Sequence, residues 1–416
     1  MRWHNTDMGR VEEAAGPRWV EPWPRDEGRR AARDLLAAAF ECKPDAEASA
    51  PGRITIMGEY TDVGGGLSLP TVIPHRTYVA VHRRDDDRIR IAHAPHESSP
   101  DGPGVWTGSL ADLVEPRDGR WVGYLAGPLW ALQERGFAGP GLDIAVTSCV
   151  PFGAGVSSLV SATAAVALAT NDAWGLGLPV GSDAHEIADL CVDVENDFVG
   201  AATAGLSQHA IVRCREGEAL LLDFSERPPR AEPCPLYFPE YGLTLLIIHA
   251  VPRAATQVEL VRSRVGEMDQ ARQALGLSSL RELVGNPGAR QLLDTIDDPL
   301  LQRRARHFLT ENERVELMRD EFSGTGPAHE RFVEAGKAMY RSHASLDANI
   351  EVSSPALNLA VETAFRSGAL GAHMMGAGVD SSAVALVRKA AAESTARMID
   401  KEFVDAGLPR PAFLML

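Results

Sequence analysis

Cysteine is scarce in this sequence, and no two cysteines lie close together. The five cysteines are odd in number and show none of the short spacings that metal sites use. This pattern argues against a disulfide framework or a cysteine-bound metal. We expect reduced, mostly buried thiols of the cytoplasm at Cys42, Cys149, Cys191, Cys214 and Cys234.

Long apolar runs are also missing. The longest, such as LTLLIIHAV at residues 243–251, have the length of one strand, whereas a membrane helix needs about 20 apolar residues. Residues 1–16 contain no apolar core of the kind that a signal peptide carries. The sequence therefore predicts a globular, cytoplasmic protein that does not span a membrane.

Positive charge is the scarcer sign. The chain has 41 Lys and Arg against 57 Asp and Glu, which gives a net charge of −16 at pH 7. This balance argues against nucleic acid or an acidic membrane surface as the main partner. It is compatible with a phosphate ligand, because a pocket can be locally positive within an acidic protein.

Length and patterning predict two domains with mixed α+β structure. At 416 residues the chain is long enough to bury two cores. Apolar spacing predicts the main elements. They are helices over residues 29–42, 120–136 and 183–200 and a strand at 53–57. We divide the chain into an N-terminal domain of residues 1–224 and a C-terminal domain of residues 225–416.

The stretch VPFGAGVSSLVSATAAVALA at residues 150–169 joins a glycine loop to an apolar helix. Gly153 and Gly155 allow the backbone to approach a ligand closely, and a helix that starts near Ser157 directs its first N–H groups at an anion. One interpretation is a phosphate-binding loop. The other is an ordinary glycine-rich turn capped by serine, and this stretch alone does not decide between them.

Three separated segments resemble one family. APGRITIMGEYTDVGGGLSLP (50–70) resembles the galactokinase signature, and VPFGAGVSSLVSATAA (150–165) resembles the phosphate-binding loop of the GHMP kinases. GALGAHMMGAGVDSSAVALV (368–387) is similar to the C-terminal glycine motif of the same kinases. The chain is identified as a member of the GHMP kinase superfamily, in its galactokinase-like branch. The resemblance implies a two-domain α+β fold with the active site in the cleft between the domains.

The resemblance also implies that ATP and Mg²⁺ are cofactors. Loop 151–158 would hold the triphosphate with backbone N–H groups, and Ser158 and Glu195 would hold the bridging magnesium ion. The alternatives are a helix N-cap for Ser158, a solvated helix face for Glu195 and a tight hairpin turn for the C-terminal glycines. The residues expected to contact ATP are Gly153, Gly155, Ser157, Ser158, Gly376 and Gly378.

The same resemblance assigns the acceptor site to the first motif. Arg53 would face the transferred phosphoryl group, where a positive charge stabilises developing negative charge. Glu59 and Asp62 would accept hydrogen bonds from the hydroxyls of a small polyhydroxylated substrate. The alternative for Asp62 is a turn cap at DVGGG.

The chain departs from the galactokinase pattern at positions that face the sugar. Ser207 stands where the family carries the Asp that takes or orients the proton of the attacking hydroxyl, and serine has no useful basicity near neutral pH. Ala204 replaces the glycine that approaches the sugar, and Tyr60 replaces a histidine. A tyrosine expected near the sugar aligns with Val258, and Leu159 replaces a third serine in the phosphate loop.

Two functions are compatible with these departures. In the first, the chain is an ATP-dependent kinase without a carboxylate base that phosphorylates a sugar or sugar-like polyol, with an acceptor other than galactose preferred. In the second, it is a catalytically degenerate relative that binds sugar or nucleotide as a sensor or non-catalytic partner. In either case we expect a monomer or homodimer. We predict that His209 is a packed histidine without a role, because its side chain points away from that of Ser207.

Overall fold

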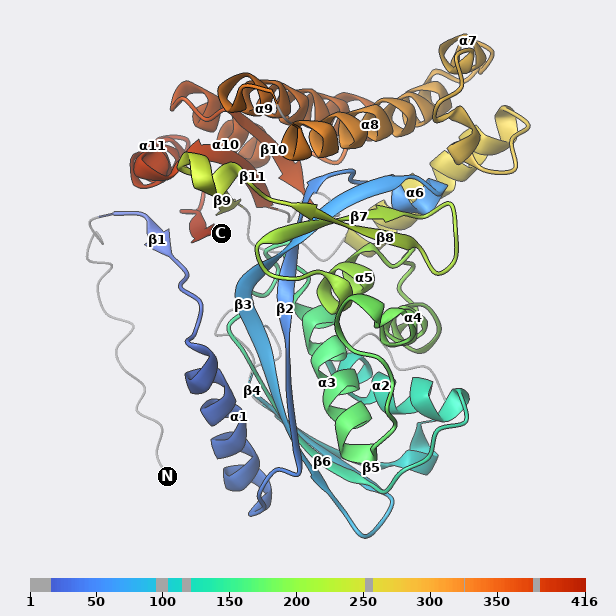
Figure 1. Ribbon diagram of the computed structural model, residues 1–416, viewed down its shortest axis with the longest axis vertical. Helices are drawn as coiled ribbons and strands as arrows, with labels where there is room; N and C mark the ends of the chain where they lie inside the picture. Colours follow the sequence, from blue (N-terminus) through green and yellow to red (C-terminus); the bar gives the residue numbers. More distant parts are fainter. Residues whose placement is uncertain (1–15, 95–103, 114–120, 251–256, 325, 377–381) are drawn as a thin grey trace.

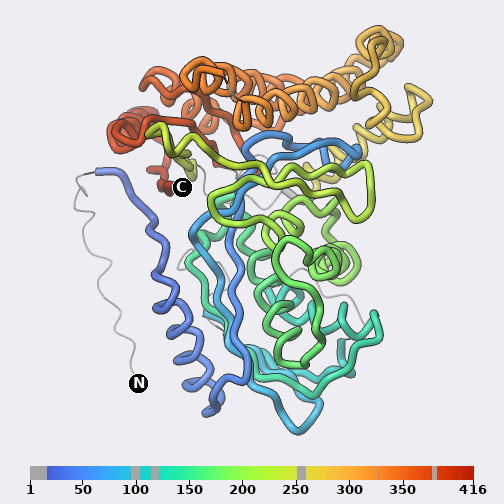
Figure 2. Tube along the Cα trace, in the orientation of Figure 1, coloured from blue at the N-terminus to red at the C-terminus, as the bar shows by residue number. Residues whose placement is uncertain are grey.

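The computed structural model describes residues 16–94, 104–113, 121–250, 257–324, 326–376 and 382–416 (Figure 1). Its strands form two sheets, one of seven strands and one of five. The Cα trace in Figure 2 shows the long strands of the larger sheet running through the lower part of the molecule, with the C-terminal helices above them. The predicted α+β class is confirmed.

The seven-stranded sheet is built around the long hairpin of β2 and β3. Its strand order is β5-β4-β6-β3-β7-β8, and β2 pairs with β3 off this path. The strands are β2 (Ala46–Met57), β3 (Leu67–Arg83), β4 (Arg88–Ala94), β5 (Gly104–Ser109), β6 (Leu142–Ser148), β7 (Glu218–Asp223) and β8 (Arg230–Pro235). The chain leaves this sheet after β8 and continues into the second sheet with β9.

Helices cover both faces of this sheet (Figure 1). They are α1 (Arg25–Phe40), α2 (Trp121–Glu134), α3 (Ser158–Trp174), α4 (His185–Asp193) and α5 (Leu206–Arg213). Because side chains alternate along a strand, β3 directs Tyr78 and Ala80 to one face and Val79 and Val81 to the other. The first pair packs against α1, and the second belongs to the core that α2 and α3 complete.

The five-stranded sheet belongs to the C-terminal half and has the order β1-β12-β9-β11-β10. Its strands are β1 (Arg18–Trp19), β9 (Leu243–His249), β10 (Gly371–Met375), β11 (Ser382–Arg388) and β12 (Ala412–Met415). The accompanying helices are α6 (Gln257–Ala274), α7 (Ala289–Leu293), α8 (Pro299–Ser323), α9 (Ala328–Ser345), α10 (Pro355–Arg366) and α11 (Ala392–Asp405). The N-terminal strand β1 thus lies at the edge of the C-terminal sheet.

One apolar cluster joins the two halves. Ile54 and Ile56 of β2 share it with Val315 and Met318 of α8 and with Leu245 of β9, and all five side chains are fully buried. Burial of each such side chain contributes about 1.5–3 kcal/mol. This shared core holds the end of β2, and the loop that follows it, between the two halves.

The predicted elements correspond closely to the observed ones. The helices expected over 29–42 and 120–136 are confirmed as α1 and α2, and the helix expected over 183–200 divides into α4 and a π-helical turn, η4 (Val194–Val199). The boundary predicted between residues 224 and 225 falls between β7 and β8, which pair within one sheet. We therefore take the crossing between the sheets as residues 236–242.

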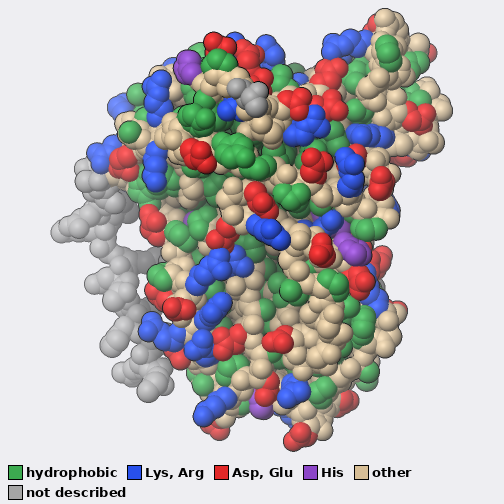
Figure 3. Space-filling view, in the orientation of Figure 1, with side chains coloured by type: hydrophobic (Ala, Val, Ile, Leu, Met, Phe, Trp, Pro, Cys, Tyr) green, Lys and Arg blue, Asp and Glu red, His purple; other side chains and the backbone are tan. Residues whose placement is uncertain are grey.

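The surface is mixed in charge. Figure 3 shows acidic and basic side chains interspersed over the visible face. Among the helices that the structure describes, none has the length and apolar character needed to cross a membrane. All five cysteines are free thiols, and Cys149, Cys191 and Cys234 are buried.

Candidate active site

The predicted phosphate-binding loop connects β6 to α3. Gly153 and Gly155 have φ of 74° and 65°, in the left-handed region that favours glycine. Behind the loop, a Cβ atom on Gly52 would lie only 2.9 Å from the carbonyl oxygen of Val156. Because Gly52 has no side chain, the loop can approach β2, where the amide N–H of Arg53 donates to that carbonyl at 3.0 Å.

Helix α3 begins at Ser158, and among the residues that the structure describes no side chain caps its N-terminus. Ser157 is the N-cap residue, with φ 62° and ψ 47°, but its hydroxyl makes no cap hydrogen bond. An N-cap role for the Ser158 hydroxyl is therefore wrong, and among the described residues no serine side chain caps the glycine-rich turn. The first N–H groups of an uncapped helix, together with the helix dipole, form a favourable site for a phosphate.

The hydroxyl of Ser157 is directed at Ser207 on α5 instead, and the two Oγ atoms lie 3.0 Å apart. Ser207 also accepts hydrogen bonds from Arg53, whose Nε and Nη2 lie 3.0 Å and 2.8 Å from the same oxygen. Because a hydroxyl has one proton and two lone pairs, this arrangement leaves Ser207 to donate to Ser157. Nη1 of Arg53 donates to the hydroxyl of Thr55 at 3.1 Å, so the buried guanidinium is oriented through three nitrogens.

A cavity of about 130 Å³ lies beside this contact, and we call it the acceptor cavity. It brings together the residues predicted for catalysis and substrate binding, which are Arg53, Glu59, Tyr60, Asp62, Ala204 and Ser207. Gly376 also lines it, and Val261 and Val265 of α6 form another part of its wall. Gly378 lies outside the described residues, as does the side chain of Val258.

Glu59 links the acceptor cavity to the C-terminal glycine motif. Its Oε1 accepts the N–H of Gly376 at 2.7 Å, and its carboxylate also accepts a hydrogen bond from the side chain of Thr55. Gly376 has φ of 89°, which a residue with a side chain rarely adopts. Glu59 therefore uses part of its hydrogen-bond acceptor capacity within the protein. Sequence reasoning missed its contact with Gly376.

Burial raises the pKa of three carboxyl groups in this region. It raises the pKa of Asp62 to about 6, although the N–H of Val63 and the charge of Arg53 oppose the shift. It raises the pKa of Glu195 to about 7, although a hydrogen bond from Gln208 and the charge of Arg53 oppose the shift. Burial also raises the pKa of Glu59. Asp62 thus accepts a hydrogen bond within its own turn, as expected for a turn cap at DVGGG. It also lines the acceptor cavity.

Glu195 lies on η4 and is half-buried, rather than on a fully solvated helix face. The side-chain amide of Gln208 donates to its carboxylate, and among the described residues nothing pairs with the buried amide oxygen of Gln208. A carboxylate with a raised pKa beside a neutral amide gains stabilisation from a nearby cation. Within the described part of the chain, no three His, Cys, Asp or Glu residues gather as a metal site, so a cation here would need oxygens of other kinds, such as those of hydroxyl groups, water or a phosphate.

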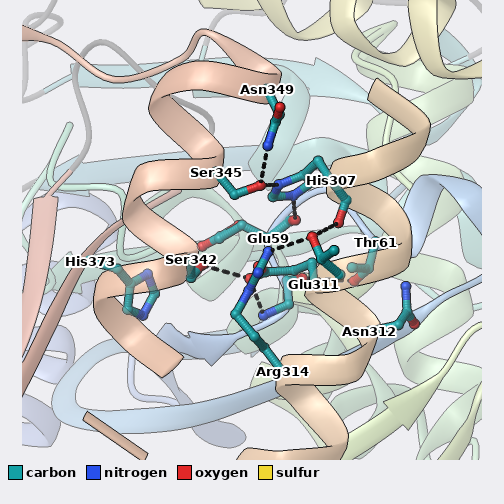
Figure 4. Close-up of polar contacts among 12 residues, drawn as sticks. Glu59, Thr61, His307, Glu311, Asn312, Arg314, Ser342, Ser345, Asn349 and His373 are labelled. Atoms are coloured by element: carbon teal, nitrogen blue, oxygen red, sulfur yellow. Dashed lines mark hydrogen bonds and ion pairs between the residues drawn. The ribbon is translucent and has the colours of Figure 1, made fainter. Parts of the chain in front are cut away.

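A buried polar row on α8 holds the loop that follows β2, and sequence reasoning missed it (Figure 4). His307 donates through Nε2 to the backbone carbonyl of Glu59 at 3.0 Å, while its Nδ1 lies 2.9 Å from the hydroxyl of Ser345. Burial lowers the pKa of His307, which favours the neutral ring that this pattern requires. One turn further along, Oδ1 of Asn312 accepts the N–H of Leu67 at 2.7 Å.

Glu311 is the charged member of the row. Its Oε1 accepts the N–H of Gly58 at 3.1 Å and the hydroxyl of Ser342 at 2.8 Å, and its Oε2 accepts from Nε of Arg314 at 2.7 Å. Burial acts to raise the pKa of Glu311, but the charge of Arg314 and the hydrogen bonds from Ser342 and Arg314 outweigh it and leave that pKa below its ordinary value. The loop that carries the acceptor residues is therefore held by an ionised, fully buried carboxylate of α8.

His209 lies apart from the Arg53–Ser207 contact. It is only 1% exposed, its Nδ1 lies 3.2 Å from Nη1 of Arg213, and its Nε2 lies 3.2 Å from the carboxylate of Asp189. Because a guanidinium can only donate, Nδ1 accepts and Nε2 carries the proton. Burial lowers its pKa, and the prediction of a packed histidine is confirmed.

Two family models match separate parts of the chain. The model described as GHMP kinases N terminal domain matches residues 124–214, and the one described as GHMP kinases C terminal matches residues 323–405. A crystal structure of mevalonate kinase shares the fold with a TM-score of 0.59 at 18% identity, over 85% of this chain and 95% of the other. With an uncapped helix behind a glycine loop, these matches define a GHMP kinase, a class of ATP-dependent phosphotransferase.

A third model, the galactokinase galactose-binding signature, matches residues 36–83. The galactokinase of Streptomyces coelicolor is 34% identical over 374 residues, which cover 89% of this chain and 92% of that protein. The galactokinase of Mycobacterium tuberculosis is 33% identical, with coverage of 87% and 94%. The crystal structure of Lactococcus lactis galactokinase complexed with galactose superposes with a TM-score of 0.81 at 26% identity, over 93% and 97% of the two chains. The chain belongs to the galactokinase family.

Proposed function

We propose that this protein transfers the terminal phosphoryl group of ATP to a hydroxyl of a sugar in the acceptor cavity, and that galactose is not its preferred acceptor. The observation that carries the proposal is the position of Arg53. Arg53 lines the acceptor cavity and its guanidinium donates to Ser207, which also lines it, while its backbone N–H holds the phosphate-binding loop. Arg53 therefore connects the cavity proposed for the sugar with the loop proposed for the phosphates of ATP.

The nucleotide phosphates would lie against loop 151–158 and the free N–H groups at the start of α3. In this proposal Gly153, Gly155 and Ser157 shape the loop, and the C-terminal glycines Gly376 and Gly378 face the nucleotide from the other half. Ser158 and Glu195 would hold Mg²⁺, which when bound offsets negative charge on the phosphates. The raised pKa of Glu195 and the orphaned amide oxygen beside it support this assignment.

The chemistry would depend on charge and positioning. The Arg53 guanidinium stabilises the negative charge on the transferred phosphoryl group, and Glu59 and Asp62 orient the acceptor through its hydroxyls. Ser207 cannot act as a base near neutral pH, so the usual gain of about 10²–10⁴-fold from general-base catalysis is absent at this position. Phosphoryl transfer through a loose transition state tolerates that loss.

The cavity wall supports an acceptor other than galactose. Tyr60 is buried in a left-handed conformation, with φ of 63°, at the position where the resemblance expects histidine. Ala204 adds a methyl group to the wall at the position where it expects glycine. Because buried polar groups without a partner penalise a poorly matched ligand strongly, such changes alter the choice of substrate.

The proposal also covers the cellular location and the oligomeric state of the protein. The reaction needs ATP, so we place it in the cytoplasm. Its site, as described, is built from residues of one chain, so a monomer or a homodimer can carry it. Size-exclusion chromatography with light scattering distinguishes the two assemblies.

A coupled ADP-release screen over sugars and amino sugars, paired with calorimetric titration of a non-hydrolysable ATP analogue and Mg²⁺, tests the proposal. We expect nucleotide binding that weakens in Ser158→Ala, and turnover of a sugar other than galactose. Efficient turnover of galactose would refute the specificity. Sugar or nucleotide binding without turnover of any sugar would favour the catalytically degenerate alternative, for which the missing base at Ser207 is the main argument.

A further inference from the structure

A second cavity, of about 380 Å³, adjoins the acceptor cavity. Asp62, Thr203 and Ala204 line both cavities, so they form the wall that the two share. The second cavity lies between α4 and the segment 224–229 that follows β7. Its volume falls in the range of ligand-binding pockets, whereas the acceptor cavity alone is smaller than that range.

The shared wall is held in place by hydrogen bonds. The side-chain amide of Asn196 donates to the carbonyl of Thr203 at 3.1 Å, and its oxygen accepts the N–H of the same residue at 2.8 Å. Thr203 also caps the next turn, because its hydroxyl accepts the N–H of Gly205 at 3.1 Å. A wall bonded in this way is preorganised, so a ligand that spans both cavities would not have to order it.

The polar groups of the second cavity are mainly acceptors. His209 uses its only ring proton on Asp189, whose side chain is 37% exposed and keeps further lone pairs for a ligand. Asp193 also lines this cavity, and its carboxylate is 42% exposed although it accepts from Arg135. Hydroxyl and amino groups of a ligand could donate to both carboxylates.

The charge of the lining decides which ligands fit. Four acidic residues, Asp62, Asp189, Asp193 and Glu226, line this cavity together with one basic residue, Arg227. Two further arginines contact the lining: Arg135 pairs with Asp193, and Arg213 contacts His209. An anionic substituent would therefore meet net repulsion. A neutral, hydroxyl-rich group would instead find several acceptors.

We propose that the second cavity is a subsite for a neutral, polyhydroxylated substituent on the acceptor, such as a second sugar ring. This inference rests on the proposed function and names the class of substrate for the same site. The acceptor sugar occupies the first cavity next to Arg53, and its substituent passes the wall of Thr203 and Ala204 into the second.

Calorimetric titration in the presence of the ATP analogue and Mg²⁺ tests this proposal. The probes are galactose, galactosyl-galactose disaccharides linked at O3, O4 or O6, and the acidic counterpart galacturonosyl-galactose. We expect at least one neutral disaccharide to bind about tenfold more tightly than galactose, and the acidic one to bind more weakly than its neutral match. If galactose and nucleotide bind but no disaccharide binds more tightly, the subsite is refuted and the proposed function stands. If neither sugar nor nucleotide binds, the proposed function itself fails and the subsite fails with it.

Two cavity-filling variants locate the bound substituent. Val192→Trp fills the second cavity from α4, and Glu226→Trp fills it from the opposite, exposed segment. The matched control is Val180→Trp, because Val180 is 63% exposed and lines neither cavity. We expect both variants to weaken disaccharide binding about tenfold while galactose binding stays within about twofold. Unchanged disaccharide binding in both variants, with thermal melting like that of the control, would refute the assignment.

Discussion

Oγ of Ser207 lies 2.8 Å from Nη2 of Arg53, so a neutral hydroxyl occupies the place opposite the guanidinium. A carboxylate there would neutralise part of the arginine charge, whereas a hydroxyl leaves that charge available to the phosphoryl group. A carboxylate there would also supply a proton acceptor, which a hydroxyl does not do near neutral pH. With Ser207, the cavity therefore lacks a base, but the positive charge of Arg53 is not neutralised by a carboxylate.

Ser207→Asp is expected to raise the turnover of the accepted sugar by about 10²-fold or more, because it restores a general base. Arg53 would hold the new carboxylate ionised by lowering its pKa. The measurement is kcat in the coupled ADP-release assay, with Ser207→Asn as the control of similar shape that has no basicity. Loss of activity in Ser207→Asp, with Ser207→Asn active, would show instead that the native hydroxyl donates to a substrate group.

Gly153→Val is expected to abolish binding of the ATP analogue. A β-branched residue at φ of 74° is strained, and the loop that cradles the phosphates would change its path. Gly136→Val is the matched control, because Gly136 has φ of 82° and, as at Gly153, a Cβ atom added there would meet no other atom within 4 Å. Both variants should lose a similar amount of stability, about 1–2 kcal/mol. Equal nucleotide affinity in the two variants would contradict the assignment of the loop.

Glu311→Gln is expected to raise KM for the sugar more than KM for ATP. The change leaves the largely buried Arg314 without its carboxylate and weakens the anchor of the Gly58 N–H, at a cost of about 3–5 kcal/mol in stability. Glu313→Gln on the same helix is the control, because Glu313 pairs with Arg290 at the surface and should contribute only about 0–1 kcal/mol. A parallel rise in both KM values would mean that α8 does not act through the acceptor loop.

The affinity for Mg²⁺ and the ATP analogue is expected to rise between about pH 6 and pH 8. Glu195, whose pKa burial raises to about 7, must lose its proton before it can bind a cation. Glu195→Gln should flatten this part of the pH dependence, whereas Glu186→Gln, at an exposed position of α4, should keep it. An unchanged slope in Glu195→Gln would remove Glu195 from the metal site.

The same carboxyl group has a consequence for the stability of the ligand-free protein. The pKa of Glu195 is about 7 in the folded protein and about 4.3 in the unfolded chain. The stability that Glu195 contributes to the folded state is therefore fully present below about pH 4 and is lost as the pH rises through about 7. Glu195→Gln should therefore be more stable than the wild type at about pH 8, by thermal melting without nucleotide. A variant less stable than the wild type at that pH would contradict the raised pKa.

The site was predictable where local chemistry sets the structure. The glycines of the phosphate loop and the motif around Arg53 carry their own turn and strand preferences, so the local conformation of each segment follows from its own residues. Their approach to each other depends on the packing of the loop against β2. The contact between Ser157 and Ser207 was not predictable in the same way, because it depends on the packing of α5 against α3. That the family's base is missing at Ser207 stays a prediction, and the hydroxyl network around Ser207 was not foreseen from the sequence.

The polar row of α8 shows why the rest could not be predicted. His307, Glu311 and Asn312 lie in a stretch rich in charged residues, where a polar helix face normally indicates solvent. Their burial depends on a loop that is more than two hundred residues away in the chain. Only the three-dimensional arrangement reveals that unsatisfied backbone groups of that loop need these side chains.

β1 lies beside β12, so the beginning of the chain completes the sheet that its end forms. Strands near the two ends of the described chain therefore pair in one sheet, and the N-terminal half contributes β1 to the sheet of the C-terminal half. A gene divided between codons 224 and 225 would produce one fragment that keeps β1 but lacks its sheet and another that takes β8 away from its neighbour β7. Such fragments should reassemble when they are produced together and aggregate when they are produced alone, which makes this a chain suited to split-protein complementation.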